Sequence, residues 1–298
     1  MTMLGMLKQI KHRFFSLEGF YGALSHLKGL KRGRLNDFDR PVVVSLTAVP
    51  WRFEKLHLVL MSLLWQKIRP DHIVLWLSKY DQNGTQITTI EDLPKNIRRL
   101  HRMGVEIEFV EDIRSYRKLL PALERFPNAI VVTADDDILY PSGWLENLLR
   151  GHEQHTDAIV CYRGTQILLD QNGLAPYKQW PEYTRRDEPS YLLFAQGGEG
   201  ALYPPGSLHP EVQNREAFMH ICPTADDVWF KAMALYNNVP HVKITDKHQD
   251  FPRIRGSQAE GQSLHHVNNI LGHNDHQVAA VFSRYNLEAR LKESEEQV

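Results

Sequence analysis

The sequence has few cysteines, no long apolar run and almost no net charge. Its 298 residues include only 2 cysteines, so at most one disulfide could form, which argues against a disulfide-stapled secreted scaffold. The longest apolar candidate, residues 56–65, falls short of the ~18 residues that a membrane-spanning helix needs. A formal net charge of −1 argues against a general nucleic-acid binder. We therefore expect a globular enzyme or binding protein in the cytoplasm.

The small net charge hides an uneven distribution. The first 40 residues carry a formal charge of +5, which leaves −6 on the rest of the chain. Apolar residues such as Leu7, Ile10 and Phe14 interleave with these cations. A basic amphipathic segment of this kind can lie on an anionic leaflet, so residues 1–34 predict peripheral attachment to the inner face of the plasma membrane. A solvated helical face is the alternative.

Apolar runs and amphipathic segments alternate from residue 41 onward. Short apolar runs predict strands at residues 41–47, 73–78, 105–110, 129–133 and 158–162. Periodic segments predict helices at residues 53–66, 93–103, 119–126, 144–153 and 224–237. This alternation predicts an α/β fold with a mostly parallel sheet and helices on both faces. A segment rich in Pro, Tyr and charge predicts a long loop over residues 171–190.

Changes in composition divide the chain into four parts. We expect a basic amphipathic segment (1–40), two halves of one domain (41–141 and 142–283) and a charged C-terminal helix or tail (284–298). Nothing repeats at the period of a solenoid.

Three consecutive carboxylates give the strongest chemical signal. Asp135, Asp136 and Asp137 directly follow the strand predicted at 129–133, and open α/β sheets bind ligands at the carboxyl ends of their strands. Like charges in one place are unfavourable unless a cation neutralises them, which favours Mg²⁺ or Mn²⁺ bridging to phosphate oxygens. In extended backbone Asp135 and Asp137 would face the same side, leaving Asp136 to orient them or to bond the backbone. A solvated acidic turn is the alternative.

The strand followed by Asp-x-Asp resembles the GT-A glycosyltransferases. Four further segments are similar to that family in the same order: VSLTAVPWR at 44–52, DIRSYRK at 112–118, GGEG at 197–200 and DDVW at 226–229. The resemblance spans roughly residues 41–280. It implies a Rossmann-like GT-A fold whose first half binds a nucleotide-sugar and whose second half binds the acceptor. It also implies a divalent metal, Mn²⁺ or Mg²⁺.

The resemblance implies a role for each matching residue on the donor side. Asp137 would be the principal metal ligand, and Asp135 would contact the ribose or the metal. The other donor contacts would come from Asp136, Thr47, Arg52, Lys118 (with Arg117 as its alternative), Gly197 and Gly198. Taken singly, Arg52 and Lys118 are better explained as ordinary surface cations, and the glycines could equally be plain turn residues. Of several late histidines, His265 is the one we assign to the metal.

Two carboxylates at the start of the helix predicted at 224–237 are the candidate catalytic residues. The resemblance implies that Asp227 is the general base that deprotonates the acceptor hydroxyl, with Asp226 in support, and that the reaction inverts the anomeric centre. Carboxylates are also favoured at this position as helix caps, and we expect one of the two to act as a cap.

These signals favour a metal-dependent glycosyltransferase. The expected donor is a UDP-sugar, and the expected acceptor is a lipid-linked or growing surface glycan such as lipopolysaccharide or capsule. Two alternatives remain open. A metal-dependent phosphoester or diphosphate hydrolase also uses clustered Asp, and a non-catalytic nucleotide-sugar or glycan-binding module needs no base.

Overall fold

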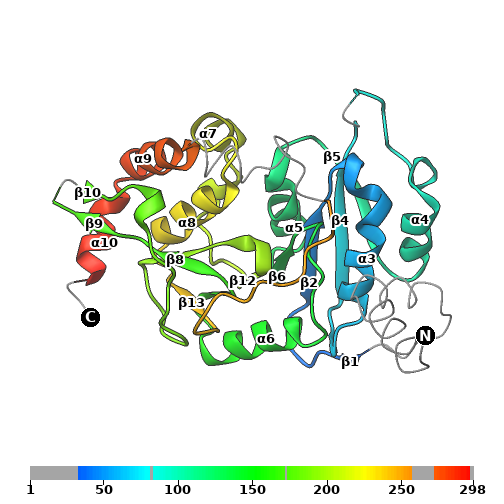
Figure 1. Ribbon diagram of the computed structural model, residues 1–298, viewed down its shortest axis with the longest axis horizontal. Coiled ribbons are helices and arrows are strands. Elements are labelled where there is room, and N and C mark those ends of the chain that lie inside the picture. Colours follow the sequence, from blue (N-terminus) through cyan, green and yellow to red (C-terminus); the bar gives the residue numbers. More distant parts are fainter. Residues whose placement is uncertain (1–32, 81–82, 172, 257–271, 296–298) are drawn as a thin grey trace, which may run out of the picture.

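The computed structural model describes residues 33–80, 83–171, 173–256 and 272–295. Its centre is a seven-stranded sheet in the order β13-β7-β12-β6-β2-β4-β5, in which β12 runs antiparallel to both of its neighbours and the other strands are parallel (Figure 1). The strands are β2 (Val42–Thr47), β4 (His72–Ser78), β5 (Glu106–Val110), β6 (Ile130–Ala134), β7 (Ile159–Cys161), β12 (Ala201–Tyr203) and β13 (His241–Lys243).

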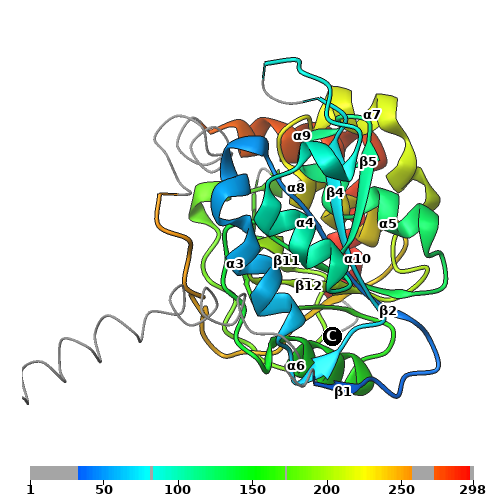
Figure 2. The same cartoon turned by 90° about the vertical axis from the view of Figure 1, so that its right-hand side faces the viewer.

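Helices cover both faces of this sheet. In Figure 2, α3 lies to one side of β4 and β5, and α5 lies to the other. The first face carries α3 (Phe53–Leu64), α4 (Lys95–Arg102) and α6 (Trp144–Gln154). The second carries α5 (Leu120–Arg125), α7 (Arg215–Ile221), α8 (Asp226–Tyr236), α9 (His273–Tyr285) and α10 (Leu287–Glu295).

The remaining strands are two or three residues long and pair outside the main sheet. They are β1 (Arg34–Leu35), β3 (Ile68–Arg69), β8 (Gly164–Gln166), β9 (Leu169–Asp170), β10 (Gly173–Leu174) and β11 (Leu193–Ala195). Within the described residues, no helix is both long and apolar enough to cross a bilayer.

The strand β2 shows why an apolar run becomes the middle of the sheet. Val42, Val44 and Leu46 pack into the core beneath α3, while Val43 packs into the core on the α5 side. Ser45 is buried on that same side and accepts a hydrogen bond from Trp76 Nε1 at 2.8 Å. Both faces of the strand are therefore dry, and each apolar side chain contributes ~1.5–3 kcal/mol through burial.

The reversed strand β12 brings a glycine-rich turn to the carboxyl edge of the sheet. Because β12 is antiparallel to β6, with Ala201 opposite Thr133, its first residue lies where β6 ends. The turn Gly197–Glu199 precedes it directly. Gly200 has a φ of 108°, and a Cβ there would lie 2.5 Å from Trp144 Nε1, so only glycine fits.

The sequence predicted this fold class correctly. The mixed α/β architecture, with a largely parallel sheet between helices, is consistent with a Rossmann-like GT-A fold, and every predicted strand is in the sheet. The sheet continues across residue 141, so both predicted halves share it. The prediction missed β12 and β13, which are three residues long and show no periodicity. Residues 1–32 of the basic segment lie outside the described residues.

Candidate functional site

The acidic residues that follow β6 lie at the carboxyl edge of the sheet and pair with Lys118, Arg52 and Arg253. The strand ends at Ala134 and the chain turns, so the extended backbone on which Asp135 and Asp137 were expected to face the same side is not present. Asp135 lies 3.5 Å from Lys118 Nζ. Asp137 is buried and lies 3.4 Å from Arg52 Nη2 and 3.3 Å from Arg253 Nη1.

Asp136 is held between a backbone amide and Arg52. Its carboxylate accepts a hydrogen bond from the Val49 N–H at 3.2 Å and forms an ion pair with Arg52 Nη1. Burial raises the pKa of Asp136 to about 6, against the opposing attraction of Arg52. Of the two roles expected for Asp136, the structure therefore shows the hydrogen bond to the backbone.

The two predicted donor residues near the end of β2 lie in different environments. The Thr47 hydroxyl donates to the Trp76 carbonyl oxygen at 2.7 Å, which ties β2 to β4. Arg52 lies over the Trp51 ring, 4.5 Å from its centroid, and its guanidinium faces the acidic residues. The contacts predicted from these two residues to a nucleotide stay predictions.

Lys118 joins the acidic residues after β6 to those at the start of α8. Its Nζ lies 3.0 Å from Asp226 Oδ2, 3.5 Å from Asp135 Oδ1 and 4.0 Å from Asp227 Oδ1. The side chain is only 9% exposed. Burial lowers the pKa of Lys118, but the neighbouring carboxylates, Asp226 foremost, outweigh it and raise the pKa well above its ordinary value. Lys118 is thus a buried, charged residue and not a surface cation.

Several hydrogen bonds fix the turn that carries Lys118, the segment Arg114–Lys118 (η3). The Ser45 hydroxyl donates to the Lys118 carbonyl oxygen at 2.6 Å, beneath β2. The buried Tyr116 hydroxyl donates to the Cys222 carbonyl oxygen at 2.6 Å, just before α8. Arg114 has a φ of 57°, and its guanidinium donates to the Pro223 carbonyl oxygen at 2.8 Å. A non-glycine residue in this left-handed region is uncommon, and such positions concentrate at functional sites. The Arg117 side chain is also buried, beside Asp112.

Neither carboxylate at the start of α8 caps the helix. The N-cap is Ala225, and no side chain bonds the free N–H groups there, so the expected cap was wrong. Asp226 instead pairs with Lys118, while Asp227 accepts a hydrogen bond from the Gly197 N–H at 3.2 Å. Burial raises the pKa of Asp227 to about 7; Lys118 opposes the rise and Asp226 adds to it. The Asp227 side chain stays 28% exposed, so a ligand can reach it.

The glycine-rich turn lies against both groups of carboxylates. A Cβ on Gly197 would lie 2.9 Å from Asp227 Oδ1, and one on Gly198 would lie 3.3 Å from Asp135 Oδ2. The Gly198 carbonyl oxygen accepts from the Tyr140 hydroxyl at 2.9 Å. The two glycines therefore permit a close approach between backbone and acidic side chains.

Three charged residues of the site were not predicted from the sequence. Glu199 is 2% exposed and lies 3.2 Å from Arg163 Nη1 and 3.4 Å from Arg253 Nη2. Glu199 belongs to the GGEG segment, which could have marked it. Arg163 and Arg253 stand in segments without any motif, and only the fold brings them together. The Ile254 N–H donates to the Asp137 carbonyl oxygen at 2.7 Å, which fastens Arg253 beside the site.

The carboxylates outnumber the cations in this site. Four cations (Arg52, Lys118, Arg163 and Arg253) face six carboxylates (Asp135, Asp136, Asp137, Glu199, Asp226 and Asp227), which leaves a formal charge of −2. Among the described residues, no group of three or more His, Cys, Asp or Glu side chains is arranged to hold a metal. Mg²⁺, however, is usually bound through one or two carboxylates together with substrate phosphates. Asp135, 31% exposed, and the buried Asp137 fit that smaller donor set.

The histidine assigned to the metal, His265, lies outside the described residues. Another late histidine, His248, pairs with Glu182, which is not one of the carboxylates of the acidic site. Its Nε2 lies 3.1 Å from the Gly164 carbonyl oxygen.

Fold and site together define an α/β protein with a Rossmann-like sheet and an acidic, lysine-bridged site at its carboxyl edge. No protein family matches the chain, and no curated protein is similar in sequence. One similar solved structure is S. aureus TarS 1–349, with 11% identity and a TM-score of 0.43 over 70% of this chain. The match spans only 59% of the TarS chain. A second, 4-diphosphocytidyl-2C-methyl-D-erythritol synthase, has 12% identity and a TM-score of 0.42 over 78% of this chain and 96% of its own.

Proposed function

We propose that the protein is a metal-dependent glycosyltransferase that moves a sugar from a nucleoside diphosphate donor, with UDP as the expected nucleotide, to a hydroxyl group. One observation carries the proposal. Lys118 Nζ lies within ion-pair distance of Asp135, just after β6, and of both Asp226 and Asp227 at the start of α8. A group that binds the donor and a group that can act as base are therefore neighbours.

The donor side of the site has the charges that a leaving diphosphate needs. Asp135 and Asp137 would hold Mn²⁺ or Mg²⁺, which would neutralise charge on the diphosphate. The formal charge of −2 would repel an anionic donor that arrives without a cation. Arg52 and Arg253 lie beside Asp137 and supply donors for phosphate oxygens.

The acceptor side has a carboxylate suited to proton abstraction. A general base works best when its pKa lies near the working pH, and Asp227 has a pKa of about 7. Asp227 accepts the proton of the acceptor hydroxyl while that oxygen forms a bond to the anomeric carbon and the bond to the diphosphate breaks. Direct displacement of this kind inverts the anomeric centre. Asp226 keeps Lys118 in place.

The proposed acceptor also predicts where the protein acts in the cell. A lipid-linked or growing surface glycan would lie close to the membrane, and the basic segment of residues 1–34 would bind the anionic leaflet. Almost all of this segment lies outside the described residues, so the attachment is tested separately, by sedimentation with anionic vesicles.

A thermal-shift screen of nucleoside diphosphates and sugar nucleotides, with and without Mn²⁺, tests the proposal. A ligand at 100 times its Kd stabilises the folded state by ~2.7 kcal/mol, or roughly 4 °C in a chain of this size. We expect that shift to require Mn²⁺ in the wild type and to disappear in Asp137→Asn. Asp157→Asn, which changes an exposed carboxylate before β7, is the matched control.

Two results would contradict the proposal. An equal shift with and without Mn²⁺ would exclude the metal. Sugar or phosphate released at the same rate with and without any acceptor would favour the hydrolase instead.

A further inference from the structure

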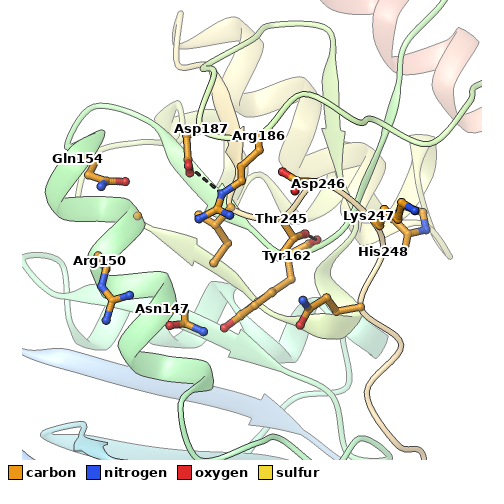
Figure 3. A pocket seen from close by; sticks show the side chains of 13 residues that line it. Asn147, Arg150, Gln154, Tyr162, Arg186, Asp187, Thr245, Asp246, Lys247 and His248 are labelled. Carbon is orange, nitrogen blue, oxygen red and sulfur yellow. Dashed lines mark hydrogen bonds and ion pairs between the residues drawn. The ribbon is translucent and has the colours of Figure 1, made fainter.

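A polar hollow of about 450 Å³ lies between α6 and the segment that follows β13 (Figure 3). Arg150 and Gln154 line it from α6, Arg186 from the loop after β10, and Lys247 and His248 from the segment after β13. Pockets for small ligands have volumes of ~300–1,000 Å³, so the hollow can hold one or two sugar units.

Three cations, Arg150, Arg186 and Lys247, line this hollow. Among the described residues, Arg150 and Lys247 have no carboxylate within ion-pair distance. Arg186 donates through Nε to Asp187 at 2.9 Å, which leaves its two terminal nitrogens for a ligand. The lining has a formal charge of +1, because Asp187 and Asp246 are its only carboxylates and His248 counts as neutral. Guanidinium groups bind phosphate and carboxylate oxygens in pairs.

A strip of structure, the segment after β13, links the wall of the hollow to the acidic site. His248, on the wall of the hollow, lies 3.1 Å from the Gly164 carbonyl oxygen. Two residues further on, Asp250 lies 3.3 Å from Arg163 Nη1, and that same nitrogen lies 3.2 Å from Glu199 of the site. A polymeric ligand long enough to cross this strip can contact both the hollow and the acidic site.

We propose that the hollow binds an anionic unit of the acceptor glycan, a unit separate from the one whose hydroxyl reacts. This inference rests on the proposed function for its role in transfer, although the binding itself does not. The hollow has a formal charge of +1 and the acidic site has one of −2, so an anionic unit binds more favourably in the hollow than in the acidic site. Either a carboxylate on a sugar or a phosphate between units would suit these cations.

Calorimetry on the full chain with three probes tests the inference. The probes are a galacturonic acid hexamer, a glycerol phosphate hexamer and neutral maltohexaose. We expect at least one anionic probe to bind at least tenfold more tightly than maltohexaose. The variant Arg150→Glu/Lys247→Glu should lose about tenfold or more in affinity for that probe, because charge-assisted hydrogen bonds are replaced by repulsion. Which anionic probe binds identifies the anionic group.

A matched double variant separates the hollow from overall charge. Lys95→Glu/Arg99→Glu makes the same change of charge on α4, near the opposite edge of the sheet, and should bind the probe as the wild type does. All variants should keep the Mn²⁺-dependent shift with UDP, because none of them alters the acidic site.

The inference is overturned if no anionic probe binds, if maltohexaose binds equally well, or if both double variants lose the same affinity. It is also overturned if the Arg150→Glu/Lys247→Glu variant loses only its binding to anionic vesicles. Failure of the proposed function is a different result: the anionic probe binds in the hollow, but no sugar nucleotide shifts the melting temperature.

Discussion

Replacing Asp227 with Asn should stabilise the protein while it abolishes sugar transfer. The carboxylate is buried against Asp226 and receives only a 4.0 Å attraction from Lys118. Folding therefore holds its pKa at about 7, when the ordinary value is 3.8. An amide of the same shape still accepts from the Gly197 N–H and carries no charge.

The magnitude follows from the pKa. Holding a carboxyl at a pKa of about 7 costs the folded protein up to about 4 kcal/mol once the group is ionised. Because the side chain is 28% exposed, solvent screens part of this, and we expect a gain of about 2 kcal/mol at pH 8. Below about pH 4 this carboxyl is protonated in both the folded and the unfolded state, so the stability gained by Asp227→Asn vanishes. Between about pH 4 and 7 only the unfolded chain releases the proton, so the wild type loses more stability than the variant as pH rises.

The free energy of unfolding is measured by urea denaturation at pH 4, 6 and 8, and the rate of sugar transfer is measured at pH 8. Asp226→Asn is the control, because that change removes the closest partner of a buried lysine and should destabilise the protein by about 3 kcal/mol. The reasoning fails if Asp227→Asn is no more stable than the wild type at pH 8, or if its gain is the same at pH 4. Substantial turnover by the variant would exclude Asp227 as base.

Two further substitutions test how the site is held together. Lys118→Met leaves three carboxylates without their shared cation and should lower the free energy of unfolding by ~3–5 kcal/mol, measured by denaturation at pH 7; an unchanged midpoint would refute the bridging role. Gly197→Ala brings a Cβ to 2.9 Å from Asp227 Oδ1 and should lower kcat at least tenfold with little change in donor affinity; unchanged kcat would show that the base has room to move.

Most of the fold could be predicted because its long elements have clear periodicity. The apolar run of β2 and the amphipathic pattern of α3 each extend over several residues, so burial dictates them locally. By contrast, β12 and β13 are three residues long, and their place in the sheet comes from pairing with β6 and β7. No pattern within three residues specifies a distant partner.

The sequence predicted the site residues better than their contacts. Asp135, Asp136, Asp137, Lys118, Asp226 and Asp227 do lie together, because strand ends and helix starts meet at one edge of the sheet. The expected cap at α8 was wrong because the competing partner, Lys118, is more than 100 residues away along the chain. Arg163 and Arg253 were missed for the same reason: an isolated arginine gives no signal until folding pairs it with a buried carboxylate.

The antiparallel strand β12 also limits where this chain can change its length. It pairs with β6 on one side and β7 on the other, so one residue inserted within it would turn the following side chains to the opposite face. The segment of residues 173–190, before β11, is joined to the rest by isolated bridges and one short strand pair, so an insertion there shifts no strand of the main sheet. Arg186, on the rim of the hollow, belongs to that segment. Insertions can therefore reshape the rim of the hollow while the turn beside Asp227 keeps its register.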